Sequence, residues 1–268
     1  MICPIVELYS LNILDTLRIL FSLVMLSYAS WVDMKTREIY DIVWLFFGGI
    51  GLIIAVYEVY TGILPLVWLA LPILFSGGVS IALSYFGLFG GADVGAFITL
   101  SILHPIPPRG LIPFLGIVSV VYPLTLFSNS ALSGASFSLV LLVRNLIHAL
   151  KGRSIFEGLK QEPLWRKLVV MGTGLRVEIC SVRGPPFQYP LEHPGEDGAS
   201  KRLIIMPDIQ DDEAATDTFK RLAESGSEEV WVSHTLPFLV FIMIGYIVAL
   251  TLGDIALFLL RLFFLGRG

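Results

Sequence analysis

The chain has 268 residues, of which 55% are hydrophobic and 15% charged, and its mean hydropathy is +0.80. A typical soluble domain carries about 25% charged residues, so most of this chain has too few charges to cover a surface in water. The high apolar content excludes a disordered protein, and the net charge of −4 gives no basic surface for nucleic acid. What remains is an α-helical polytopic membrane protein with one small polar domain.

The charged residues are concentrated in one segment. Residues 151–233 hold 25 of the 40 Asp, Glu, Lys and Arg residues, and the other 185 positions share 15. This distribution predicts three parts: a membrane domain over 1–150, a small soluble insert of mixed α/β structure over 151–233, and a final transmembrane helix within 234–268.

Apolar stretches of about 20 residues, the length that crosses the hydrocarbon core, predict about six transmembrane helices. We expect the first three at about 12–32, 42–57 and 64–86, and the last at 236–260. The fourth is expected to start at the glycine-rich turn 87–93 and to end near 104. The fifth is expected to follow an irregular segment at 110–121 and to end at about 146. The first is expected to be retained rather than cleaved as a signal peptide, because Glu7 and Asp15 precede its apolar segment, 19–32, in place of a basic region.

The polar insert has local signals of its own. β-Branched residues over 167–182 and 201–205 predict strands, while Gly184-Pro-Pro186 and 193–198 predict turns. Residues 211–224 predict a short helix, since acids lie in its first turn and basic residues come late, as the helix dipole prefers.

Cysteine and histidine give no sign of a metal centre. Cys3 and Cys180 lie in different regions, and the four histidines are scattered without ligand spacing. We therefore expect two free cysteines, no metal and no cofactor.

Positive charges near helix ends predict which loops are cytoplasmic. Lys35 and Arg37 follow the first helix, and Arg144, Lys151 and Arg153 flank the end of the fifth. These loops, the insert and the glycine-rich turn are therefore expected on the cytoplasmic side of the cell membrane. With six spans, the N-terminus is then outside.

Acids are rare outside the insert, and Asp93 is the most informative of them. It follows a double glycine, opens an apolar helix and lies between two long uncharged stretches. An ionised acid in hydrocarbon costs about 2.5–3.5 kcal/mol even on insertion scales, so such an acid suggests a function. The alternative is structural, since Asp also caps helices and this turn could simply start one.

The expected topology places Asp33, at the end of the first helix, on the same membrane face as Asp93. Two carboxylates close together do not both ionise easily, so one keeps its proton. The ionised carboxylate can draw a proton from water while the neutral one polarises a peptide carbonyl, which is peptide hydrolysis by general acid–base catalysis. Gly90 and Gly91 would let a substrate backbone approach closely.

Two motifs in these positions resemble the GxGD membrane aspartyl peptidases, and most closely the archaeal prepilin and preflagellin (prearchaellin) peptidases. The first is Asp33-Met-Lys-Thr-Arg-Glu-Ile39, and the second is Gly90-Gly-Ala-Asp93. Weaker similarities occur at 122–129, Arg144-Asn145, 230–239 and Gly245-Tyr246.

The resemblance implies a catalytic pair, Asp33 and Asp93, with Gly90, Gly91 and Ala92 as the motif beside it. It also implies an endopeptidase that removes short basic leader peptides from membrane-inserted archaellin or pilin precursors at the cytoplasmic face. The Cys-x-x-Cys pairs of bidomain bacterial enzymes are missing, so methyltransferase activity is not expected. Oligomeric state is not indicated.

Other interpretations stay open. Glu38 and Asp41 could recognise a basic leader, or balance Lys35 and Arg37, and Asp41 could cap the second helix. A presenilin-like or signal-peptide-peptidase-like protease is a related alternative, although no Pro-Ala-Leu motif occurs.

Two alternatives are not enzymes. A transporter or channel could use Asp93 and Asp254 as intramembrane polar sites, with helices broken at glycine pairs, although no inverted repeat is evident. Asp254 could also pair with Arg261. A membrane scaffold whose insert binds partners is the last alternative, in which both candidate aspartates would be structural.

Overall fold

The computed structural model describes residues 12–151, 155–159, 161–195, 201–209, 211–234 and 237–265. Glu7, Cys3 and part of the expected 193–198 turn lie outside these ranges. The chain forms two compact units, one of Met1–Gly134 with Pro237–Gly268 and one of Ala135–Leu236. The domain boundaries expected at 150 and 233 stay predictions.

Seven helices with described residues contribute to the first unit, and the fifth continues into the second unit. They are α1 (Ile13–Thr36), α2 (Ile42–Tyr60), α3 (Leu66–Tyr85), α4 (Gly91–Leu103), α5 (Tyr122–Leu150), α8 (Phe238–Thr251) and α9 (Ile255–Leu265). The first five were predicted within a few residues. Local chemistry sets some of their ends, since the Asn12 side chain accepts a hydrogen bond from the Leu14 N–H at 3.3 Å and Pro65 directly precedes α3.

Four of these helices, α1, α2, α3 and α5, are long and apolar enough to cross a membrane, and the pair α8–α9 makes a fifth if it is one span. The chain is therefore a mostly helical multi-pass membrane protein. α4 has 13 residues, a length of about 20 Å at 1.5 Å per residue, so it is shorter than a typical span of about 20 residues.

The prediction of one continuous final helix at 236–260 is wrong, because α8 and α9 meet at an angle of 58°. Gly253 at the break has a φ of +100°, which favours glycine. The irregular segment before α5 supplies the missing partners: the Phe114 and Leu115 N–H groups donate to carbonyls at the end of α8, and Asp254 N–H donates to Ile117 O at 2.7 Å. The break is thus stabilised by residues distant in sequence.

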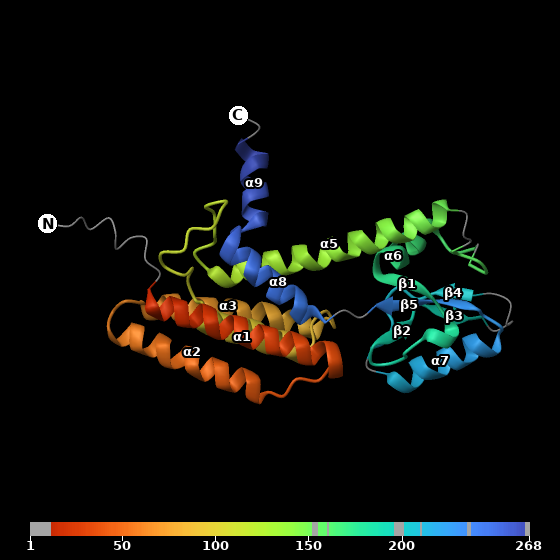
Figure 1. Cartoon of the computed structure of the whole chain (residues 1–268), viewed down its shortest axis with the longest axis horizontal. Helices are drawn as coiled ribbons and strands as arrows, with labels where there is room; N and C mark the ends of the chain where they lie inside the picture. The colour runs from red at the N-terminus through yellow and green to blue at the C-terminus, as the bar shows by residue number, and fades with distance from the viewer. Residues whose placement is uncertain are drawn as a thin grey trace. The chain divides into compact units, whose positions relative to one another are not determined.

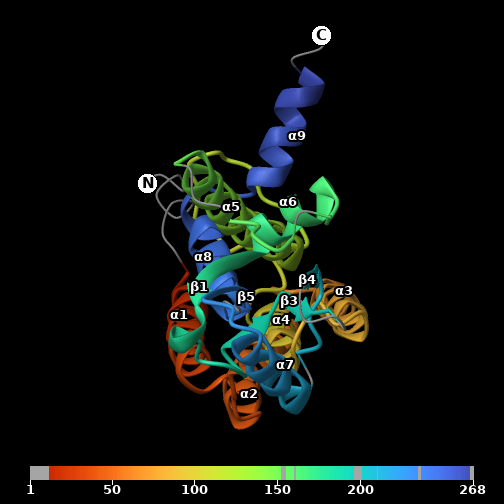
Figure 2. The same ribbon diagram turned by 90° about the vertical axis from the view of Figure 1, so that its right-hand side faces the viewer.

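α4 is the central helix of the first unit. It lies between α2 and α3 (Figure 2) and also packs against α1 and α8. Its buried residues Ala96, Phe97, Leu100 and Leu103 join one apolar core with side chains of α1, α2, α5 and α8. Figure 1 shows α1 and α2 running side by side in this unit.

The second unit is a small α/β module around a three-stranded antiparallel sheet. The strands are β1 (Gly174–Glu178), β5 (Glu229–His234) and β2 (Gln188–Pro190), in the order β1-β5-β2, with Gly174 opposite Ser233 and Tyr189 also opposite Ser233. A two-stranded sheet pairs β3 (Glu192–Pro194) with β4 (Lys201–Leu203). The short 3-10 helix η2 (Ile179–Ser181) follows β1.

Two helices complete this unit, α6 (Leu164–Thr173) and α7 (Asp212–Glu224). α7 confirms the helix predicted over 211–224, and Asp211 caps it by accepting from the Ala214 N–H at 2.9 Å. The prediction of strand over 167–182 is wrong before residue 174 and again over Ile179–Ser181, which form η2. α6 forms before residue 174 because Pro163 starts a helix whose Val170 and Met171 become buried in the apolar core around Trp231.

Candidate active site

Asp93 lies in the first turn of α4, with its carboxylate tied to the start of that helix. Its Oδ2 accepts a hydrogen bond from the Gly90 N–H at 2.9 Å, and only 9% of the residue is exposed. Gly90, not Asp93, is the N-cap residue. The structural interpretation is therefore partly right: this carboxylate does stabilise a helix start, where negative charge is favoured. Oδ1 makes no hydrogen bond or ion pair within the described residues.

The glycines beside Asp93 leave its surroundings open. A Cβ added to Gly90 would lie 3.6 Å from Asp93 Oδ2, and one added to Gly91 would meet no atom within 4 Å. Both glycines are exposed, whereas Ala92 is half-buried. The space beside the Asp93 carboxylate is therefore open to a substrate backbone. A larger side chain at residue 90 would fill that space.

Asp33 is half-buried in the last turns of α1, which ends at Arg37 in a left-handed conformation (φ 62°). Its carboxylate makes no hydrogen bond or ion pair in the described part of the chain. It lies close enough to Asp93 for charge repulsion between the two carboxylates, and Arg37 exerts an attractive field on it. The structure thus brings the two predicted aspartates to the same end of the helices.

Two side-chain contacts hold this end of the helices in place. The sequence did not indicate either of them. Gly95, half a turn after Asp93, accommodates the Trp44 indole of α2: a Cβ at Gly95 would lie 2.6 Å from Trp44 Cδ1. Phe89, directly before the glycine pair, packs on Phe127 and Phe238, with ring centroids 5.7 and 4.9 Å away. These contacts anchor both sides of the Gly90–Asp93 turn.

The other acids at this end, Glu38 and Asp41, are exposed. Asp41 occupies the N-cap position of α2 but makes no capping hydrogen bond, so the expected cap is not formed. Lys35 instead lies over the Trp31 ring, 4.0 Å from its centroid. Within the described residues neither acid forms an ion pair, and thus neither balances Lys35 or Arg37 by direct contact.

Asp254 is buried at the break between α8 and α9, and hydroxyls surround it. Its Oδ2 accepts from the Thr125 hydroxyl at 2.7 Å, and its Oδ1 from the Ser128 hydroxyl at 3.3 Å and the Leu257 N–H at 2.9 Å. It therefore caps α9. The expected alternative pairing with Arg261 does not occur.

A cluster of four charges, which the sequence did not reveal, occupies the opposite end of α1 and α2; Asp15, Arg18 and Glu58 are buried and Arg109 is half-buried. Arg18 Nη2 lies 2.8 Å from Glu58 Oε2, and Arg109 Nε lies 2.9 Å from Asp15 Oδ2. Arg109 also bonds Glu58. Burial disfavours the charged form of Arg109, but hydrogen bonds and charges of both acids outweigh it and raise its pKa. Two acids and two arginines thus neutralise one another.

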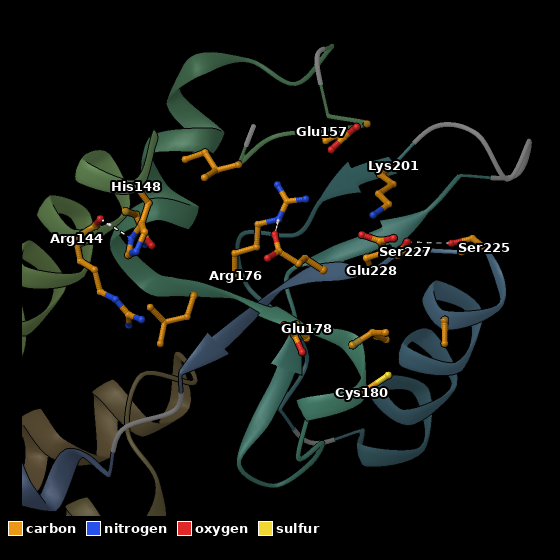
Figure 3. A pocket seen from close by; sticks show the side chains of 18 residues that line it. Arg144, His148, Glu157, Arg176, Glu178, Cys180, Lys201, Ser225, Ser227 and Glu228 are labelled. Carbon is orange, nitrogen blue, oxygen red and sulfur yellow. Dashed lines mark hydrogen bonds and ion pairs between the residues drawn. The ribbon is translucent and has the colours of Figure 1, made fainter. Parts of the chain in front are cut away.

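The second unit contains a cleft of about 1340 Å³. Figure 3 shows Arg144 and His148 of α5 at one side and Glu157, Lys201 and Glu228 at the other. Some charges in the cleft are already paired, since Arg176 Nε lies 2.9 Å from Glu229 Oε2. Among the described residues, no three His, Cys, Asp or Glu side chains are close enough together to hold a metal ion.

Comparison with known proteins assigns the family. The profile of the type IV leader peptidase family matches residues 20–152, which include both aspartates, and that of the archaeal peptidase A24 C-terminus, type II, matches residues 166–255. The chain belongs to the prepilin/preflagellin peptidase family. Membership confirms the resemblance drawn from the two motifs, and it makes the protein a leader peptidase.

Two curated relatives agree with this assignment. The preflagellin peptidase of Methanococcus maripaludis is 23% identical over 235 residues, which cover 84% of this chain and 90% of that protein. The preflagellin peptidase of Methanococcus voltae is 24% identical over 241 residues, covering 84% of this chain and 91% of that protein. Neither relative supports the transporter or scaffold alternative.

Proposed function

We propose that this peptidase is an aspartic endopeptidase of the GxGD type, in which Asp33 and Asp93 together cleave leader peptides from flagellin-like (archaellin) or pilin-like precursors. The observation that carries the proposal is that these two carboxylates lie at one end of the helices, close enough for charge repulsion, and that no arginine is bonded to either within the described residues. The names of the relatives support preflagellins as the substrate class.

In the proposed reaction, one carboxylate is ionised and the other is protonated. The ionised carboxylate takes a proton from water as the water oxygen adds to the carbonyl carbon of the scissile peptide bond, and the other carboxyl gives its proton to the carbonyl oxygen. The tetrahedral intermediate, a gem-diol, then collapses: one of its hydroxyls returns a proton to the carboxylate that had donated, the C–N bond breaks, and the amine leaves with the proton that the first carboxylate had taken from water. Open space beside Gly90 and Gly91 would admit the substrate backbone.

The reaction is proposed for the cytoplasmic face of the membrane. Lys35 and Arg37 at the Asp33 end supply the positive charges that favour this side. For the second unit, Arg144 and Lys151 at the end of α5 support a cytoplasmic location as well.

The test uses membranes that contain the full chain and a precursor archaellin or pilin. Asp33→Asn and Asp93→Asn should each abolish leader removal and leave membrane insertion and protein level unchanged. Asp41→Asn is the matched control, since Asp41 is an exposed acid in the same region with no capping bond; its turnover at saturating precursor should equal that of the parent. Near-normal cleavage by either site variant would refute the aspartic mechanism.

A further inference from the structure

α6 presents an exposed apolar face on the second unit. Leu164 is 77% exposed, Trp165 56% and Leu168 57%, whereas Val170, on the other side of the helix, and Met171, one turn after Leu168, are buried in the core. Large apolar side chains gathered on one helix face mark a contact surface.

The second half of α5 packs beside α6 and carries a similar face. Asn145 joins the two elements, since its Nδ2 donates to Met171 O at 2.8 Å and to Gly174 O at 2.9 Å. Leu142 and Ala149, on the same side of α5 as Asn145, contact the core. At 100° per residue, the exposed apolar residues fall on another side of the helix; they are Leu139, Val140, Val143, Leu146, Ile147 and Leu150.

The chemistry of both faces fits a lipid bilayer. α5 has 29 residues and is long and apolar enough to span; its length of about 44 Å exceeds a hydrocarbon core of about 30 Å. Its far end, which α6 packs against, therefore continues through the interfacial region. The apolar face of α6 is thus adjacent to the part of a membrane helix that leaves the hydrocarbon.

The polar residues of α6 also suit a membrane surface. Arg166 and Lys167 are half-buried and, at 100° per residue, lie on the sides of the helix that flank and oppose the apolar face. The Arg166 guanidinium is 5.5 Å from the centre of the Trp165 ring. Arg166 also pairs with Glu162 at 3.3 Å, and the Lys167 ammonium lies 5.5 Å from the centre of the Phe156 ring. Trp and Leu on one face with basic residues beside them are typical of helices that lie in the interface.

We propose that α6 is an interfacial helix. Leu164, Trp165 and Leu168 insert at the boundary between headgroups and acyl chains of the bilayer that this chain spans. The contact holds the second unit at the membrane surface. This inference goes beyond the proposed peptidase mechanism and does not depend on it.

The test measures the depth of α6 in vesicles of phosphatidylcholine and phosphatidylglycerol that contain the full chain. Cys3 and Cys180 are replaced by Ser, and a nitroxide is attached to Leu164→Cys, Trp165→Cys or Leu168→Cys in turn. Thr216→Cys on the exposed face of α7 is the matched control. Electron paramagnetic resonance then compares relaxation by oxygen, which concentrates in lipid, with relaxation by a water-soluble nickel chelate.

At the three α6 positions, oxygen should relax the nitroxide several-fold more strongly than nickel does, and the order should reverse at residue 216. Replacing the two neighbours of a label at 168, as Leu164→Glu with Trp165→Glu, should shift that label toward the nickel-accessible pattern and leave residue 216 unchanged. Nickel accessibility at all three α6 positions equal to that at 216 would overturn the proposal. Protection from both reagents would also overturn it, and would indicate contact with protein, such as a second copy of the chain.

Discussion

The acids at the two ends of α1, α2 and α4 have opposite surroundings. At one end Asp15 and Glu58 are buried and bonded to Arg18 and Arg109. At the other end Asp93 is also buried, yet within the described residues its carboxylate has one backbone N–H as partner. Burial alone therefore does not distinguish a structural acid from a candidate catalytic one, whereas the partners do.

The difference has a physical reason. A buried charge is tolerated when an opposite charge and hydrogen bonds compensate it, so a set of two acids and two arginines is stable as a closed unit. Arginines bonded in this way to Asp33 and Asp93 would occupy the oxygens that general acid–base catalysis needs. The carboxylates proposed for catalysis have fewer partners. This lowers the stability of the folded state, and other interactions in the fold must offset the loss.

The largest expected effect separates the two roles of Asp93. Asp93→Asn and Asp93→Ala should both lower leader removal by at least about 100-fold, because each removes an acid–base group worth 10²–10⁴ in rate. Only the alanine variant should also lose stability, by about 1 kcal/mol, since an asparagine oxygen can still accept from the Gly90 N–H. Processing assays and thermal unfolding in detergent measure the two effects. Substantial cleavage by the asparagine variant would leave Asp93 with the helix-start role alone.

A second prediction concerns the closed set of charges. Arg18→Met leaves Asp15 and Glu58 with Arg109 alone, and breaking a buried ion pair in this way costs about 3–5 kcal/mol. The free energy of unfolding in mixed micelles should fall by that amount, while the folded fraction still removes leaders. The double variant Arg18→Met with Glu58→Gln, which is balanced in charge, should recover part of the loss.

Lys35→Met is the control for that experiment, because Lys35 is an exposed basic residue whose ring contact is worth about 0.5–1 kcal/mol. If Arg18→Met is as stable as the balanced double variant, the four charges do not act as a unit.

Much of the fold could be predicted, since apolar length and Asn, Pro and Gly signals locate α1 to α5. The break between α8 and α9 could not. Residues 238–265 are apolar almost throughout, and the Gly253 break is stable because backbone groups of residues 114–117, more than a hundred positions earlier, bond the freed groups. The start of β1 was also misplaced, because β-branched Val169 and Val170 favour a strand locally while burial of Val170 against Trp231 favours a helix.

The candidate aspartates could be singled out for a specific reason: few acids lie in or near the membrane helices, and two of them were expected at helix ends on one membrane face, Asp33 late in α1 and Asp93 in the first turn of α4. The contrast between the two ends was not predictable. Arg109 meets Asp15 across 94 positions and Glu58 across 51, and no local pattern links them. The same holds for Trp44 and Gly95, which come from different helices. Long-range partners thus decide which acids are structural.

The smallest expected effect extends the comparison to helix caps. Asn12 caps α1 through the Leu14 N–H, whereas Asp41 at the same position of α2 makes no capping bond. Asn12→Ala should therefore lower the free energy of unfolding by about 1 kcal/mol, and Asp41→Ala by less than about 0.5 kcal/mol, as for other exposed residues without partners. Unfolding curves in the same micelles measure both variants. An equal loss of unfolding free energy in both variants would mean that Asp41 stabilises α2 through a contact other than a cap. The acids at the Asp33 end would then contribute to stability, as those at the other end do.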